Sequence, residues 1–239
     1  MHNVLPLQES FVFCMAQTPR GLSIQATNDM NKRVNQRNLK SQCNALVDIE
    51  PRFQNVLDKY GYPPLWDKPE SFATLIDIIL GQQVSLDSAR ACFDKLGNLI
   101  GEITPERFIG LDDDELRSVG FSRQKTAYGR ETANALLTGT LRLENLRHLE
   151  DAMVKTELEK VKGIGNWTSD IYLLMAMLRP DVMPRGDIAL HAGWQDLAGL
   201  DKRPDADEFL MIAADWSPYR SVAARLLWHF YLSERGRRW

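Results

Sequence analysis

The chain has 239 residues, of which 44% are hydrophobic and 26% charged, and a formal net charge of −3. This balance is typical of a soluble globular protein with one large domain or two small lobes, and it excludes a mostly disordered chain. Three cysteines are too few for a disulfide framework and fit a reducing compartment. The apolar run from Ile171 to Leu178 is far shorter than the roughly 18 residues that span a membrane. A protein that coats nucleic acid would be strongly basic, whereas an enzyme with a small footprint needs only a local basic face.

The polar, partly basic segment 1–44 shows no sustained apolar period, so we expect a flexible N-terminal tail there. From residue 45 to 239 the apolar residues recur at helical spacing. No stretch alternates with the period of two that is typical of a strand. The sequence therefore predicts an all-α protein. The expected helices cover 45–60, 71–82, 86–99, 111–119, 122–137, 146–161, 166–178, 188–198, 205–214 and 221–232, and a further short helix is expected to begin at Thr104-Pro105.

Two expected helices meet at Lys162-Gly163-Ile164-Gly165. The two glycines permit a tight hairpin, Ile164 would fill the angle between the helices, and Asn166 is expected to cap the second helix. Backbone N–H groups gathered at a helix N-terminus bind phosphate without reading sequence, and Lys162 adds positive charge. An ordinary helix-turn-helix corner is the alternative for a GxG pattern on its own.

Three further motifs accompany this hairpin in a fixed order: Leu80-Gly81-Gln82-Gln83-Val84-Ser85, then Pro184-Arg185-Gly186-Asp187, then Trp216-Ser217-Pro218-Tyr219-Arg220. Together they resemble the helix-hairpin-helix/Gly-Pro-Asp DNA glycosylase superfamily, and most closely its 3-methyladenine DNA glycosylase II branch. The resemblance covers residues 45–239. It implies two helical lobes, 70–172 and 45–69 plus 173–239, with a DNA-binding cleft between them.

By this resemblance the catalytic residue is Asp187. Cleavage of an N-glycosidic bond passes through a cationic sugar, which a fixed carboxylate stabilises. An aspartate that only caps a helix is the alternative. The resemblance places Trp167 at the wall of the base pocket, with Trp216 and Tyr219 as further candidates, because aromatic rings attract a cationic methylated base. We expect Trp194 and Trp228 to pack in the core.

The resemblance also implies the DNA contacts. Gln83 matches the residue that fills the gap left when a base leaves the duplex. The hairpin motif supplies the other DNA-binding candidates, which are Lys162, Gly163, Ile164, Gly165 and Thr168. In the family the hairpin carbonyls hold a monovalent cation, and the matching residues are Glu159, Val161 and Ile164. No organic cofactor is required.

Two positions distinguish this chain within the superfamily. The type member of the branch has a tyrosine where this chain has Ile171, with Tyr172 adjacent, so we expect a less aromatic pocket. The bifunctional relatives that resemble endonuclease III carry a Schiff-base lysine at the position of Trp167. A tryptophan forms no Schiff base, so the resemblance implies a monofunctional enzyme that leaves an abasic site.

We therefore expect a glycosylase that releases alkylated purines such as 3-methyladenine from double-stranded DNA during base excision repair. Three alternatives remain: a glycosylase for an oxidised or deaminated base, a non-catalytic DNA-structure binder, and an all-α interaction protein. The expected partner is duplex DNA with a damaged base, the expected state is a monomer, and no membrane is involved. The expected location is the cytoplasm or nucleoid in a bacterium and the nucleus in a eukaryote.

Overall fold

The computed structural model describes residues 33–237, and every regular element in that range is helical, which confirms the all-α prediction. No helix in the described range is long and apolar enough to cross a bilayer. The elements are α2 (Leu39–Ile49), α3 (Phe53–Tyr60), α4 (Phe72–Gly81), α5 (Leu86–Ile100), α6 (Pro105–Ile109), α7 (Asp113–Ser118), α8 (Arg123–Leu137), α9 (Leu143–Leu146), α10 (Asp151–Glu159), α11 (Asn166–Ile171), the π-helical turn η1 (Tyr172–Ala176), α12 (Ile188–Ala198), α13 (Ala206–Ala214) and α14 (Arg220–Glu234).

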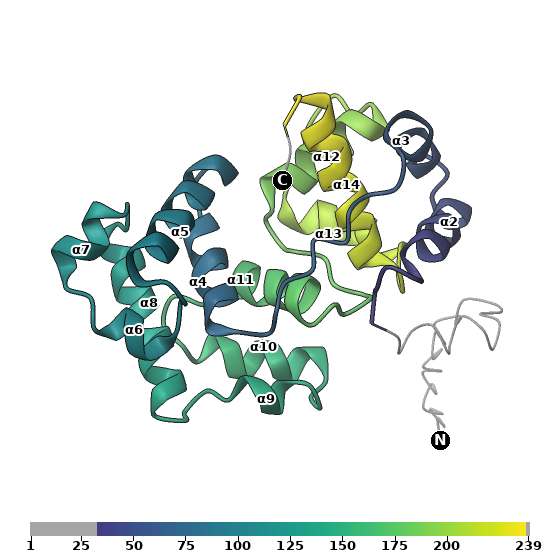
Figure 1. Cartoon of the computed structure of the whole chain (residues 1–239). Helices are drawn as coiled ribbons and strands as arrows, with labels where there is room; N and C mark the ends of the chain where they lie inside the picture. Colours follow the sequence, from purple (N-terminus) through teal and green to yellow (C-terminus); the bar gives the residue numbers. More distant parts are fainter. Residues whose placement is uncertain (1–32, 238–239) are drawn as a thin grey trace, which may run out of the picture.

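Two groups of helices lie side by side (Figure 1). Helices α4 to α10 form one lobe, helices α2, α3 and α12 to α14 form the other, and α11 lies between them. The first lobe has its own apolar core, which includes Phe72, Ile76, Leu96 and Phe108. The larger core belongs to the second lobe and extends through the π turn into α10 and α11. The two lobes therefore share the α11–η1 segment as a common wall.

The first described helix begins earlier in the chain than the sequence indicates. Helix α2 starts at Leu39, inside the segment expected to be a tail, and Val34 is fully buried with its N–H donating to the carbonyl of Leu178 at 2.8 Å. The helix expected over 45–60 is divided, because Pro51 has no N–H to continue the ladder and α3 starts anew at Phe53. Residues 1–32 of the expected tail lie outside the described range.

Serine caps start the helices that frame the candidate site. The side chains of Ser71, Ser85 and Ser122 accept hydrogen bonds from backbone N–H groups in the first turns of α4, α5 and α8. Each bond satisfies a donor that the helix leaves unpaired, and such a cap contributes about 1 kcal/mol. Of the three, Ser85 lies in the short connection between α4 and α5, which also carries Gln82 and Gln83.

A fully buried guanidinium joins the π turn to the second lobe. Arg225 on α14 donates to the carbonyls of Leu65, Ser221 and Leu174 at 2.8 to 3.0 Å. Burial lowers the pKa of Arg225 to about 10, so the group remains charged at neutral pH. The charge is held by three carbonyl dipoles, which fix the π turn against both α14 and the chain that leads to α4.

Candidate active site

A groove of about 1250 Å³ opens between the lobes. One side comes from α4, α5 and the connection between them, the other from α12 and α14, and α11 also contributes to the lining. Gln83, Trp167, Asp187 and Trp228 all line it. The structure thus brings residues from four separated segments to one place.

Asp187 is held by both of its carboxylate oxygens. It is the N-cap of α12, and Oδ1 accepts a hydrogen bond from the N–H of Leu190 at 3.1 Å. The indole Nε1 of Trp167 donates to Oδ2 at 3.1 Å, and Nε1 of Trp228 donates to Oδ1 at 3.4 Å. Asp187 therefore caps a helix, as the alternative proposes, and also presents a fixed negative charge to the groove.

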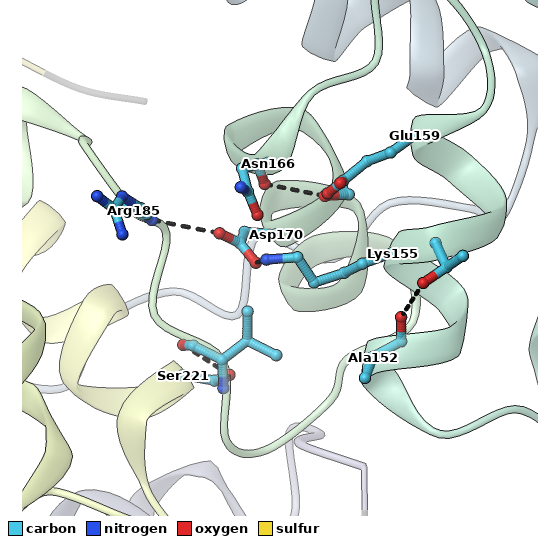
Figure 2. Close-up of polar contacts among 10 residues, drawn as sticks. Ala152, Lys155, Glu159, Asn166, Asp170, Arg185 and Ser221 are labelled. Carbon is cyan, nitrogen blue, oxygen red and sulfur yellow. Dashed lines mark hydrogen bonds and ion pairs between the residues drawn. The ribbon is translucent and has the colours of Figure 1, made fainter.

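The loop that carries Asp187 is tied to α11 by Asp170 (Figure 2). Asp170 is 4% exposed; its Oδ1 pairs with Lys155 Nζ at 2.6 Å, and its Oδ2 accepts the N–H of Arg185 at 3.2 Å. Burial raises the pKa of Asp170, and the hydrogen bond from Lys155 partly offsets this. The hairpin helix and the aspartate loop consequently hold a fixed distance from each other.

The other end of the same loop is anchored on α14. Arg220 binds Asp181 with two guanidinium nitrogens at 2.8 Å, and Ser217 donates to Asp181 at 2.8 Å. The backbone N–H of Val182 donates to the hydroxyl of Ser221 at 2.9 Å. An Arg–carboxylate pair with two hydrogen bonds fixes the relative orientation of the two groups as well as pairing their charges. Contacts to α11 and to α14 thus hold both ends of the loop in place.

The hairpin has the tight geometry expected from its glycines. Gly163 has φ 102°, and a Cβ at this position would overlap the ring of Tyr128 on α8. Ile164 is buried and fills the corner. Gly165 is the N-cap of α11, so the expected cap at Asn166 is wrong by one residue. Within the described chain, the N–H groups of Gly163 and Gly165 have no acceptor, and Lys162 is exposed beside them.

Gln82 and Gln83 follow α4 and differ in their contacts and exposure. Gln82 Nε2 donates to the carbonyl of Gly163 and to the hydroxyl of Thr168, both at 2.9 Å. Thr168 is 2% exposed and its hydroxyl accepts this internal hydrogen bond, so its expected contact with DNA stays a prediction. Gln83 is exposed and lies at φ 57°, a left-handed conformation that is uncommon outside glycine and often marks a functional position.

The aromatic candidates separate into groove and core. Trp167 lies over Gly81, where a Cβ would be 3.7 Å from its ring atom Cη2, and Ile171 continues the groove wall. Tyr172 is fully buried and does not line the groove. The expectation of a pocket less aromatic than the type member's stays a prediction.

Trp216 is not a pocket residue. It is 1% exposed and packs among Phe53, Trp194 and Phe209 with ring centroids 4.8 to 5.9 Å apart. Tyr219, at the N-cap of α14, is likewise absent from the groove lining. Trp216 is kept out of the groove because its ring packs against α3, α12 and α13. A role of Tyr219 in the pocket stays a prediction.

Sequence reasoning missed two residues of the site. Trp228 was expected in the core, and although it is 2% exposed its indole N–H reaches Asp187. Gln82 binds residues 81 and 86 positions away, a pairing that no local pattern signals. Trp228 lies on α14, the helix that directly follows the motif that contains Trp216, and only this position could have suggested its role.

The described residues contain no group of three His, Cys, Asp or Glu side chains placed to hold a metal ion. The cation expected in the hairpin depends on backbone carbonyls instead. The carbonyl of Val161 accepts the N–H of Ile164 at 3.0 Å, which leaves its second lone pair available. The side chain of Glu159 accepts the hydroxyl of Ser169 at 2.6 Å. Ligation by Glu159, Val161 and Ile164 stays a prediction.

Comparison with known proteins agrees with this geometry. A family model described as HhH-GPD superfamily base excision DNA repair protein matches residues 76–218. A putative DNA-3-methyladenine glycosylase, YfjP, from Bacillus subtilis is 29% identical over 181 residues; the match covers 72% of this chain and 63% of the relative, so the chain spans less than two thirds of that protein. DNA-3-methyladenine glycosylase 1 from Schizosaccharomyces pombe is 30% identical over 68% of this chain and 73% of its own length.

The solved structure of a 3-methyladenine DNA glycosylase from S. pombe in complex with abasic DNA superposes with a TM-score of 0.72 at 26% identity. The superposition covers 80% of this chain and 95% of that one. This chain belongs to the HhH-GPD superfamily of base excision DNA repair proteins, and its relatives there include DNA-3-methyladenine glycosylases.

Proposed function

We propose that this protein is a monofunctional DNA glycosylase that hydrolyses the N-glycosidic bond of alkylated purines, 3-methyladenine above all, in duplex DNA. One observation carries the proposal: the carboxylate of Asp187 is fixed by the indole N–H groups of Trp167 and Trp228 at the edge of a groove. The names of the relatives support the same substrate class.

In the proposed reaction Asp187 acts electrostatically. As the bond between base and sugar breaks, positive charge develops on the sugar, and the fixed carboxylate stabilises it without reorganising. The same carboxylate orients the water that attacks C1′, and the products are a free base and an abasic site. A base methylated at N3 or N7 is already cationic and leaves readily, so the mechanism needs no separate general acid.

The base reaches the groove by leaving the duplex. Gln83, exposed beside the groove, is the proposed wedge that fills the vacated space. Trp167 is the proposed stacking surface for the extruded base, because its ring lines the groove next to Asp187. Stacking and cation–π attraction both favour a positively charged purine there.

The hairpin is the proposed grip on the DNA backbone. The unpaired N–H groups of Gly163 and Gly165 and the exposed ammonium of Lys162 offer donors and charge to a phosphate. Nothing inside the protein demands glycine at position 165, where φ is −110° and a Cβ would meet no atom within 4 Å. Close approach of a DNA backbone would explain why position 165 is glycine.

The test is base release from methylated duplex DNA by the parent and by Asp187→Asn. We expect the variant to lose about 10²–10³-fold in rate, the usual effect of removing one preorganised electrostatic group, while it still binds DNA with an abasic site. Asp205→Asn is the matched control, because Asp205 caps α13 in the same way but lies outside the groove. Failure of the parent to release methylated bases would contradict the proposal, as would full activity of Asp187→Asn.

A further inference from the structure

The groove extends beyond Trp167 to an end that the proposed chemistry does not use. Asp77 and Gly81 are one turn apart on α4 and both line the groove, as do Trp167, Ile171 and Met175 at spacings of four along α11 and the π turn. Trp167 lies over Gly81. Asp77 is therefore about 6 Å further along the groove wall than the glycine beneath the stacking ring.

Lys68 closes this end. Its backbone N–H donates to the carbonyl of Met175 at 3.0 Å, and its Nζ lies 2.7 Å from Oδ2 of Asp77. The side chains of Lys68 and Asp77 are 29% and 23% exposed. Both line the groove, so the ion pair faces the cavity and remains accessible from it.

The pair leaves one acceptor free. Oδ2 of Asp77 is engaged by Lys68, whereas Oδ1 accepts no hydrogen bond from any described residue. The neighbouring lining residues Ile78, Ile171 and Met175 are apolar. A partly exposed ion pair adds little to stability, but an open carboxylate oxygen on an apolar wall discriminates strongly between a donor and an acceptor placed against it.

We propose that Asp77, positioned by Lys68, is a specificity-determining residue that accepts a hydrogen bond from an N–H group on the far edge of the extruded base. This rests on the proposed function. The residue selects purines that carry a donor on that edge, as 3-methyladenine does with its exocyclic amino group. It rejects purines whose edge carries only acceptors, as in 1,N6-ethenoadenine, where that nitrogen is closed into a ring and has no hydrogen.

The experiment compares single-turnover release of 3-methyladenine and of 1,N6-ethenoadenine from duplex DNA by the parent and by Asp77→Asn. Asparagine keeps the shape but offers an N–H donor to the base. We expect the ratio of the two rates to fall by about tenfold or more, the usual effect of losing a hydrogen bond to a charged group. A change that only disturbed the fold would slow both reactions equally. If ethenoadenine release is below detection in the parent, competition between the two lesion duplexes for binding gives the ratio of their affinities, which we expect to fall in Asp77→Asn as well.

Two further variants sharpen the test. Asp113→Asn breaks the 2.6 Å ion pair with Arg130, outside the groove, and should leave the ratio unchanged. The double variant Lys68→Gln with Asp77→Asn replaces the ion pair by a neutral pair and should lose the preference as Asp77→Asn does. It serves as the test if the single variant does not fold.

The outcomes separate this inference from the proposed function. If the parent releases 3-methyladenine and the ratio is unchanged in both Asp77 variants, the role of Asp77 is wrong while the glycosylase assignment stands. If the parent releases neither lesion, the proposed release of alkylated purines is itself wrong.

Discussion

Gln82 and Gln83 are neighbours in the chain, yet one holds the protein together and the other faces outward. Gln82 ties the end of α4 to the hairpin through Gly163 and Thr168. Gln83 is exposed in a left-handed conformation directly beyond this tie. The fixed neighbour holds the exposed side chain in place, as the proposed role of Gln83 as a wedge requires.

Replacement of Gln83 should separate extrusion of the base from chemistry. We expect Gln83→Ala to slow base release from duplex DNA by about tenfold or more, because filling the gap offsets an unstacking cost of a few kcal/mol. Release of the same lesion from single-stranded DNA should change little. Melting of the variant checks that the fold is intact. Equal slowing on both substrates would show that Gln83 is not a wedge.

The two hairpin glycines should respond differently to alanine. Gly163→Ala should destabilise the protein by about 1–3 kcal/mol, since alanine is strained at φ 102° and its Cβ would overlap Tyr128. Gly165→Ala should cost less than about 1 kcal/mol, because the position is open and its φ is ordinary. Urea unfolding measures both changes.

Gly165→Ala should nevertheless weaken binding to undamaged and damaged duplex alike, because a methyl group would keep a phosphate from the N–H groups. Titration of labelled duplex DNA at fixed salt measures this effect. Binding equal to that of the parent would mean that the backbone of the DNA does not approach Gly165.

The second indole donor to Asp187 can be tested alone. Trp228→Phe removes the N–H at 3.4 Å from Oδ1 but leaves the bonds from Trp167 and Leu190. We expect base release to slow about threefold to tenfold, a modest loss for a long hydrogen bond to a charge. Trp194→Phe, a core change on α12 outside the groove, controls for lost packing. Equal rates in the two variants would remove Trp228 from the site.

The anchor of the aspartate loop should make stability depend on pH. Burial raises the pKa of Asp181, but hydrogen bonds from Arg220 and Ser217 outweigh burial and hold this pKa below its usual 3.8. A lowered pKa in the folded state means that the stabilisation is present above 3.8 and is lost as the pH falls through the folded value. Asp181→Asn should therefore cost more free energy of unfolding at about pH 7 than at about pH 3. Denaturant unfolding at the two pH values tests this, and equal losses would contradict it.

The local elements could be predicted where a cap precedes a periodic apolar run. Ser71, Ser85 and Ser122 mark the starts of their helices both in sequence and in the structure. The hairpin corner at Gly163 followed from the conformations that only glycine adopts readily. The division at Pro51 was missed because the apolar stripe continues across it and outweighed the proline in our interpretation.

It was harder to predict which side chains lie in the core and which line the groove. Trp216 and Trp228 both lie in apolar surroundings, and α14 is buried along so much of its length that its periodicity does not distinguish a core face from a groove face. Gln82 was read as part of the family motif without a role, because its partners come from a distant segment. Such contacts depend on how the two lobes meet, which no local pattern encodes.

The π turn after α11 sets the register of the groove wall. An α-helix advances 100° per residue, so residues four apart drift by about 40° each turn. The wider turn at Tyr172–Ala176 counteracts this drift, and Trp167, Ile171 and Met175 all line the groove. A π turn holds one residue more than an α-helical turn, because its hydrogen bonds join residues five apart. This additional residue acts as a spacer between the hairpin and the far end of the groove. Loss of that residue would rotate Met175 away while leaving the hairpin intact, so that the depth of the base site can vary independently of the grip on DNA.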